Sequence, residues 1–116
     1  MDLPLIEGRI KRSLLEIIRK RAPHEAVGII YNDLVYELRN DSDYPLDSFA
    51  VERNELRRLI ESLMVPLPEV NESVFLWHSH PGGGVGPSRF DMQHKTPLHN
   101  HLVIALVDED IVATWY

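Results

Sequence analysis

Three residues that commonly bind metal ions, and the hydroxyl group of Ser88, fall within fourteen positions of the chain. His78 and His80 flank Ser79, and Ser88 and Asp91 follow after a glycine-rich stretch. The four residues before His78 form an apolar run typical of a strand. On a strand, residues two apart point to the same face, so the two imidazoles can aim at one point. The spacing therefore predicts a chelating pair.

The ligand types favour a catalytic zinc site. Neutral imidazole suits zinc, and the carboxylate of Asp91 can complete a set of three protein ligands with His78 and His80. Three protein ligands leave the fourth metal position open for water, which distinguishes catalytic from structural zinc sites. We therefore expect one zinc ion per chain and a hydrolytic reaction.

Ser88 begins a Ser-x-x-Asp pattern of the kind found at helix starts. As an N-cap, its hydroxyl would accept from the backbone amide three residues on, and Asp91 would lie in the first turn. Glycines between residues 82 and 86 allow the intervening loop to turn back toward the histidine strand. The Ser88 hydroxyl could also donate to the oxyanion of a tetrahedral intermediate. A purely structural role for Ser88 and Asp91 stays open.

A hydrolytic metal site also needs a general base, for which Glu25 is the best candidate. It lies at the start of an apolar stretch, 26–31, that reads as a strand. A carboxylate near the metal but not bound to it can take a proton from water and pass it to a leaving amine. The alternative is that Glu25 only solvates a sheet edge.

Together these residues resemble the JAMM motif of the MPN-domain zinc metallopeptidases, with the same spacing. In order they are Glu25, then His78-Ser79-His80-Pro81, then, after six residues, Ser88 and Asp91. The resemblance implies that the two histidines and Asp91 hold zinc, that Glu25 is the general acid/base, and that Ser88 stabilises the oxyanion. It also implies cleavage of a peptide or isopeptide bond. The family includes deubiquitinating enzymes, proteases that trim sulfur-carrier proteins, and phage tail proteins.

Two further segments are similar to phage tail assembly proteins of the lambda K type. Residues 36–40 end in an Arg-Asn pair, and Phe49 precedes an expected helix. This similarity implies a role in tail assembly or host-cell entry, with a tail component as partner. A small ubiquitin-like or sulfur-carrier protein is the other partner implied by the family. In the lambda K type a cysteine-peptidase domain commonly follows, whereas this chain contains no cysteine.

Composition is consistent with one soluble domain, and we treat 1–116 as a single JAMM/MPN-like domain. The chain is 44% hydrophobic and 26% charged, and no apolar run approaches the roughly 20 residues of a membrane span. A net charge of −6 disfavours nucleic acid and anionic lipid, so we expect a protein or peptide substrate. The absence of a signal-like start predicts a cytoplasmic location, or a phage tail component assembled in the host cytoplasm.

Hydrophobic periodicity predicts alternating helices and strands. The expected elements are a helix over 8–21, a hairpin of 26–31 and 34–38, a short strand over 49–51, a helix over 55–63, the histidine strand, a short helix from residue 89, and a hairpin of 102–107 and 111–116. We expect an α+β fold of the MPN type, a curved mixed sheet flanked by helices. Trp77 is expected in the core.

The other histidines offer weaker alternatives. His94, His99 and His101 lie close together, but this segment lacks the further carboxylate or cysteine that a second metal site needs. His24 should face away from Glu25 if both lie on a strand.

Two functions therefore remain open. The complete ligand and acid/base set favours an active metallopeptidase. The alternative is a non-catalytic assembly module of a phage tail that binds a protein and retains a structural zinc site.

Overall fold

The part of the chain that the structure describes contains five strands and flanking helices. A computed structural model describes residues 3–96, 98 and 100–116 of the chain. Its strands are β1 (Val27–Tyr31), β2 (Leu34–Leu38), β3 (Phe75–His80), β4 (His101–Val107) and β5 (Asp110–Trp115). Its helices are α1 (Gly8–Arg21), α2 (Arg53–Ser62), the 3-10 helix η1 (Leu67–Glu69), α3 (Val70–Ser73) and α4 (Arg89–Gln93).

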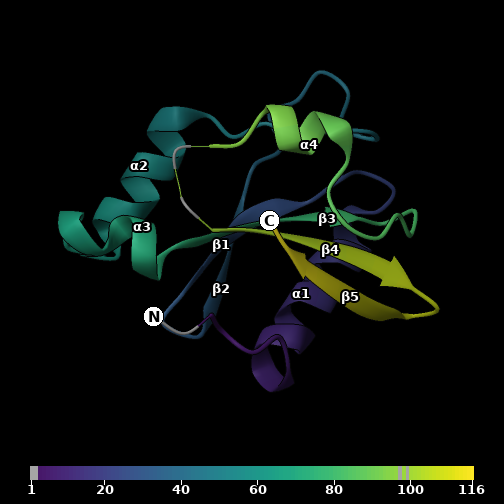
Figure 1. Ribbon diagram of the computed structural model, residues 1–116, viewed down its shortest axis with the longest axis horizontal. Coiled ribbons are helices and arrows are strands. Elements are labelled where there is room, and N and C mark those ends of the chain that lie inside the picture. Colours follow the sequence, from purple (N-terminus) through teal and green to yellow (C-terminus); the bar gives the residue numbers. More distant parts are fainter. Residues whose placement is uncertain (1–2, 97, 99) are drawn as a thin grey trace.

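Within the described residues, five strands form one mixed sheet in the order β2-β1-β3-β4-β5 (Figure 1). β3 is the central strand, and it runs antiparallel to β1 and parallel to β4. A parallel pair cannot be joined by a tight turn, so the chain crosses from β3 to β4 through the glycine-rich loop and α4. This α+β arrangement confirms the expected fold class.

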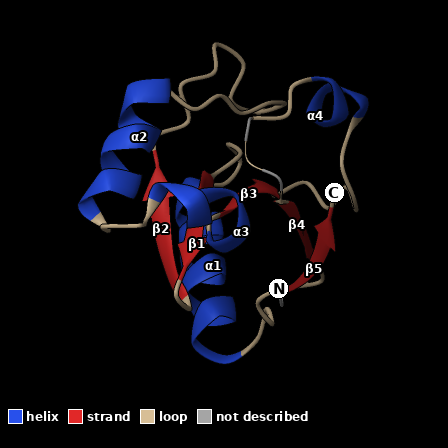
Figure 2. Ribbon diagram, turned by 60° about the vertical axis from the view of Figure 1, so that its left-hand side comes forward, coloured by secondary structure: helices blue, strands red, loops and turns tan. Residues whose placement is uncertain are grey.

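Helices cover both faces of the sheet. Figure 2 shows α1 on one side and α2 and α4 on the other. The α1 face buries Ile10, Leu14 and Ile18, which recur at the four-residue spacing of one helix stripe, against Trp77 and Leu102. Trp77 is therefore a core residue, as expected. No helix among the described residues is long and apolar enough to cross a membrane.

The opposite face buries a second apolar cluster, and this face carries the histidines. Val27, Leu76 and Phe49 belong to it, and Leu59 of α2 packs against it. Because side chains alternate along a strand, His78 shares a face with Leu76 and lies opposite Trp77. The site therefore lies on the side of the sheet covered by α2 and α4.

Each of the two hairpins has a two-residue turn. Asn32 and Asp33 join β1 to β2, and Asp108 and Glu109 join β4 to β5; all four have positive φ angles between 49° and 66°. Positive φ at both central positions gives the turn the twist of the flanking strands, and Asn and Asp tolerate it better than other non-glycine residues.

Gly28 is required by close packing inside the sheet. A Cβ atom at this position would lie 1.9 Å from the backbone oxygen of Tyr36 and 2.8 Å from the Trp77 ring. Neither neighbour can move aside, because one is backbone and the other fills the core. This explains the glycine three residues after Glu25.

One expectation about the segments around α2 is wrong, and two short helices were not predicted. Residues 49–51 form no strand, because Ala50 hydrogen-bonds Asn40 and Asp41 instead of a neighbouring strand: its amide donates to Asn40 Oδ1 (3.1 Å), and its carbonyl accepts from the Asp41 amide (2.9 Å). After α2, the proline-containing segment folds into η1 and α3, which the sequence did not predict.

Candidate metal centre

His78 and His80 point to the same place from the end of β3. Their Nε2 atoms are 3.3 Å apart. Register places this end of β3 beside the start of β1, since Val27 pairs with His78 and the Ser79 amide donates to the Ala26 carbonyl (2.9 Å). Ser79 faces away, and its hydroxyl accepts from the Ala26 amide (2.8 Å). The predicted convergence of the two imidazoles is confirmed, and their role as metal ligands stays a prediction.

Asp91 comes to the histidines through the first turn of α4. A capping box forms as predicted: the Ser88 hydroxyl accepts from the Asp91 amide (3.0 Å), and Asp91 Oδ2 accepts from the Ser88 amide (2.9 Å). The same Oδ2 lies 3.0 Å from His78 Nε2 and 3.1 Å from His80 Nε2. Burial opposes ionisation of Asp91, but hydrogen bonds from the two histidines outweigh it and hold its pKa well below the usual range.

These three atoms fit a small divalent metal ion. Tetrahedral zinc with bonds of about 2.0–2.1 Å places its ligand atoms about 3.3–3.4 Å from one another. The separations here are 3.0–3.3 Å, so the cluster needs only a small expansion. With Glu25 included, four ligand-type groups lie within 4.8 Å of one another. The residues are thus compatible with a metal site.

Glu25 lies beside this cluster but farther from it. Its Oε2 is 3.8 Å from His80 Nε2, and its buried Oε1 has no hydrogen-bond partner among the described residues. A buried carboxylate oxygen without a hydrogen-bond partner, on a residue beside a cluster of ligand-type groups, indicates that something else completes the site. Burial raises the pKa of Glu25 to about 7. The charge of His80 opposes this rise, and the charges of Asp91 and Asp47 add to it. Glu25 is therefore not a simple edge-solvating residue.

Neighbouring groups orient both imidazole rings. His80 Nδ1 lies 2.9 Å from the carbonyl oxygen of Gly84, which can only accept, so Nδ1 carries the hydrogen and Nε2 faces the cluster. Phe49 stacks on the His78 ring, with centroids 4.2 Å apart. The hydrogen bond with Asp91 raises the pKa of His80, whereas burial lowers that of His78.

Ser88 has the structural role expected of an N-cap. Its oxygen accepts from the Asp91 amide, which leaves the hydroxyl hydrogen free to donate elsewhere. Its catalytic role therefore stays a prediction that is compatible with the cap.

Asn40 is a residue supporting the site that the sequence pattern did not identify. Its side chain makes four hydrogen bonds: Nδ2 donates to the carbonyls of Glu25 (2.8 Å) and Ser48 (3.1 Å), and Oδ1 accepts from the amides of Ser42 (3.0 Å) and Ala50 (3.1 Å). The Glu25 amide donates to the Pro45 carbonyl (2.7 Å). The loop around Asn40 thus fixes the main chain that carries Glu25. The Arg-Asn pair was visible in the sequence, but nothing local indicated its partners.

Removing the Asn40 side chain should loosen this loop. We expect Asn40→Ala to lower the free energy of unfolding by about 2–4 kcal/mol, because four hydrogen bonds of roughly 0.5–1.5 kcal/mol each are lost. Urea denaturation measures the change. Asn100→Ala, which removes a single exposed bond of 3.4 Å, is the matched control. Equal stability of the two variants would contradict the role of Asn40.

The remaining histidines do not form a second ligand cluster among the described residues. His94 stacks on Phe90, with centroids 4.0 Å apart. His101 is buried beside Thr96 (Nε2 to Oγ1, 2.8 Å), and burial lowers its pKa to about 4. His99 lies outside the described residues. His24 is exposed and takes no part in the cluster.

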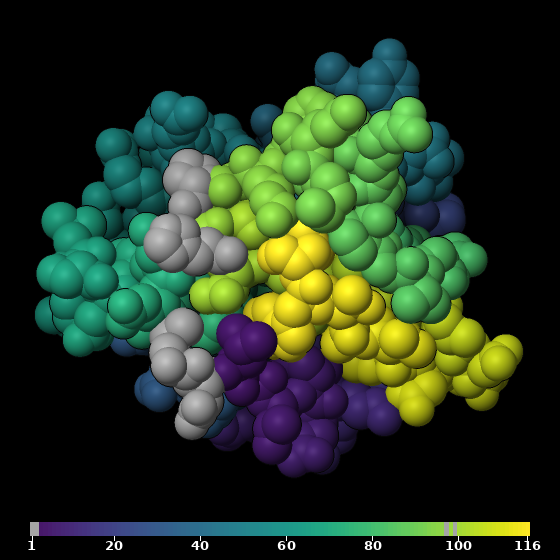
Figure 3. Space-filling model, in the orientation of Figure 1, coloured from purple at the N-terminus to yellow at the C-terminus, as the bar shows by residue number. Residues whose placement is uncertain are grey.

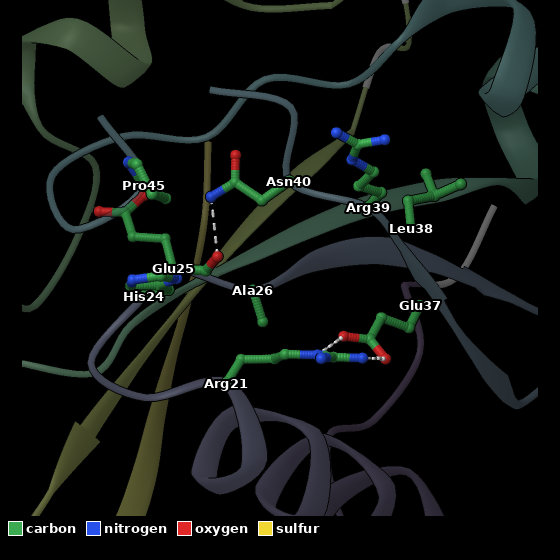
Figure 4. A pocket seen from close by; sticks show the side chains of 9 residues that line it. All are labelled: Arg21, His24, Glu25, Ala26, Glu37, Leu38, Arg39, Asn40 and Pro45. Carbon is green, nitrogen blue, oxygen red and sulfur yellow. Dashed lines mark hydrogen bonds and ion pairs between the residues drawn. The ribbon is translucent and has the colours of Figure 1, made fainter. Parts of the chain in front are cut away.

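A pocket of about 560 Å³ lies behind Glu25. Figure 4 shows the Glu25 carboxylate pointing away from the Arg21–Glu37 ion pair that lines the other side of this pocket. The pocket shares Glu25 with the cluster of ligand-type groups, but His78, His80 and Asp91 do not line it.

The comparisons with known proteins agree with this fold. Residues 8–116 match the family described as prokaryotic homologs of the JAB domain, and the chain belongs to that family. The solution structure of protein DSY2949 from Desulfitobacterium hafniense is similar in fold, with a TM-score of 0.69 and 23% identity over 90% of this chain and 76% of that one. No curated protein matches the sequence significantly. The predicted family is confirmed, whereas the phage tail branch stays a prediction.

Proposed function

We propose that the chain is a zinc-dependent hydrolase that cuts a peptide or isopeptide bond at this centre. The observation that carries the proposal is the convergence of three ligand atoms beside the unpartnered oxygen of Glu25. His78, His80 and Asp91 would hold the ion. Bound zinc would acidify a water molecule and polarise the substrate carbonyl.

The chain's own residues supply the proton transfers. Glu25 lies within reach of the cluster, and at 3.8 Å from His80 Nε2 it is placed to act on a water rather than to bind the metal. It takes the proton from that water and delivers it to the leaving amine. Ser88 donates its free hydroxyl hydrogen to the developing oxyanion.

Exposed apolar side chains around the centre support a protein or peptide as substrate. Each of these side chains lies within two sequence positions of a residue that contacts the site. They are Tyr44, Leu46, Val85, Phe90 and Met92. Exposed apolar side chains near a site are typical of surfaces that bind other proteins. By family resemblance, the substrate is a phage tail component or a small ubiquitin-like or sulfur-carrier protein.

Zinc content and chelation of the wild-type protein test this proposal. We expect one zinc per chain by elemental analysis, and hydrolysis of a ubiquitin-like or fluorogenic peptide substrate that a chelator abolishes and added zinc restores. A chain that neither contains nor takes up zinc would contradict the proposal. Bound zinc without hydrolysis of any tested substrate would favour the assembly module instead.

A further inference from the structure

Helix α1 carries a concentration of positive charge that the candidate metal centre does not use. Six of the twelve Lys and Arg residues lie within its fourteen positions, and Glu16 is its one acidic residue. Because the whole chain has a net charge of −6 and α1 one of +5, the other residues carry −11. Half of the basic side chains are therefore gathered on one segment of a chain that is otherwise strongly acidic.

Helical spacing places three of these side chains on the outward side of α1. The buried apolar residues of the helix face the sheet, so Arg9, Arg12 and Lys20 point the opposite way, and all three are exposed. We call these three residues the basic face of α1. They span about 16 Å, because a helix rises about 1.5 Å per residue. In Figure 3 the purple N-terminal part of the chain, which includes the first turns of α1, forms the lower surface of the molecule, apart from the green segment that carries α4.

The other basic residues of α1 are bound within the fold, whereas the basic face is not. Lys11 forms an ion pair with Asp110 of β5 (2.8 Å), and Arg21 forms one with Glu37 of β2. Arg19 donates to a backbone carbonyl of the last hairpin (3.1 Å). Among the described residues, no carboxylate lies within ion-pair distance of the basic face. Its three charges are therefore available to an external anion.

The acids beside α1 limit what this face can bind. Glu109 and Asp110 contact one side of the helix, and Glu37 contacts the other. Nucleic acid or an anionic membrane presents phosphates over an area wider than one helix, so its charge would meet these acids. It would also be repelled by the −11 that the chain carries outside α1. A narrow row of carboxylates on a folded protein meets only the basic face, so charge and shape favour an acidic protein surface.

We propose that the basic face of α1 is a docking surface for an acidic protein partner whose carboxylates lie in a row along the helix. Helix α1 covers the sheet face that carries Trp77, whereas His78 lies on the other face, under α2 and α4. A partner held by α1 therefore leaves the candidate metal centre uncovered. Docking needs neither zinc nor hydrolysis, so this inference is independent of the proposed function.

Reversing the charge of the basic face by Arg9→Glu/Arg12→Glu/Lys20→Glu tests the inference. The probe is a fluorescein-labelled helical peptide, about as long as α1, with glutamates three and four residues apart, and fluorescence anisotropy measures its binding. We expect wild type to bind the peptide, with an affinity that falls as the salt concentration rises. The variant should bind at least about 10-fold more weakly, because repulsion replaces attraction at three exposed positions.

The matched control is Arg53→Glu/Arg57→Glu/Arg58→Glu. It makes the same change in net charge at three exposed residues of α2, on the other side of the sheet. Charges farther away than the Debye length are largely screened, so this control should bind the peptide within about twofold of wild type.

A neutral variant keeps the test valid if three glutamates weaken the helix. Arg9→Gln/Arg12→Gln/Lys20→Gln should unfold at the temperature of wild type and still bind the peptide more weakly. Failure of wild type to bind the peptide at low salt would overturn the inference, as would equal losses in the α1 and α2 variants. Tighter binding of double-stranded DNA or of phosphatidylserine vesicles through the same three residues would overturn the assignment to a protein partner.

Discussion

Replacing Glu25 by glutamine should lower hydrolysis by about 10²- to 10⁴-fold while zinc stays bound. Glutamine has the same shape as glutamate and can keep the same main-chain bonds to Asn40 and Pro45. Its amide cannot accept a proton from water or return one to the leaving amine. The chemical step therefore loses its acid/base group, whereas the cluster of His78, His80 and Asp91 keeps all its ligand atoms.

Two readouts on the same preparation separate the roles of Glu25. Rates with a peptide or ubiquitin-like substrate report catalysis, and elemental analysis reports zinc. Glu37→Gln is the control, because Glu37 pairs with Arg21 in the pocket behind Glu25 and away from the cluster. Undiminished hydrolysis in Glu25→Gln would remove Glu25 from the mechanism. Loss of zinc in that variant would show instead that Glu25 is a ligand.

Much of the fold could be predicted because its signals are local. The buried apolar residues of α1 recur along one helix face. Both two-residue turns consist of Asn, Asp or Glu between two apolar segments. Residues 49–51 were wrongly predicted as a strand, because an apolar pair flanking alanine resembles one. The backbone amide of Ala50 instead donates to the side chain of Asn40, which lies ten residues earlier in the sequence. No sequence pattern encodes such a bond.

Those parts of the candidate site could be predicted in which the residue types and their spacing along one strand or helix determine the geometry. The two histidines share a face because strand periodicity requires it, and Ser88 and Asp91 form a capping box because their spacing allows both bonds. The groups that orient the ligands were not predictable. Gly84 acts through a backbone carbonyl, which every residue has, and Tyr116 reaches His78 from 38 positions along the chain. Tertiary contacts alone reveal such partners.

Removing both imidazoles by His78→Ala/His80→Ala should abolish zinc binding. Two of the three proposed ligands are lost, and Asp91 alone cannot hold the ion at micromolar concentration. Zinc should also stop protecting the fold. With free zinc a thousandfold above its dissociation constant, wild type gains about 4 kcal/mol of stability from binding, and the double variant should gain none. Elemental analysis and thermal unfolding with and without zinc measure both effects.

Two further variants make this result decisive. His24→Ala/His94→Ala removes two exposed histidines outside the cluster and should keep one zinc per chain. His80→Ala alone changes a partly exposed ring, 13% accessible, and avoids the cavity that loss of the His78 ring would leave beside Phe49. If His80→Ala folds and still binds zinc as tightly as wild type, the ion is not held where β3 and α4 meet. Loss of zinc in a folded His80→Ala would assign the metal to this centre even if the double variant unfolds.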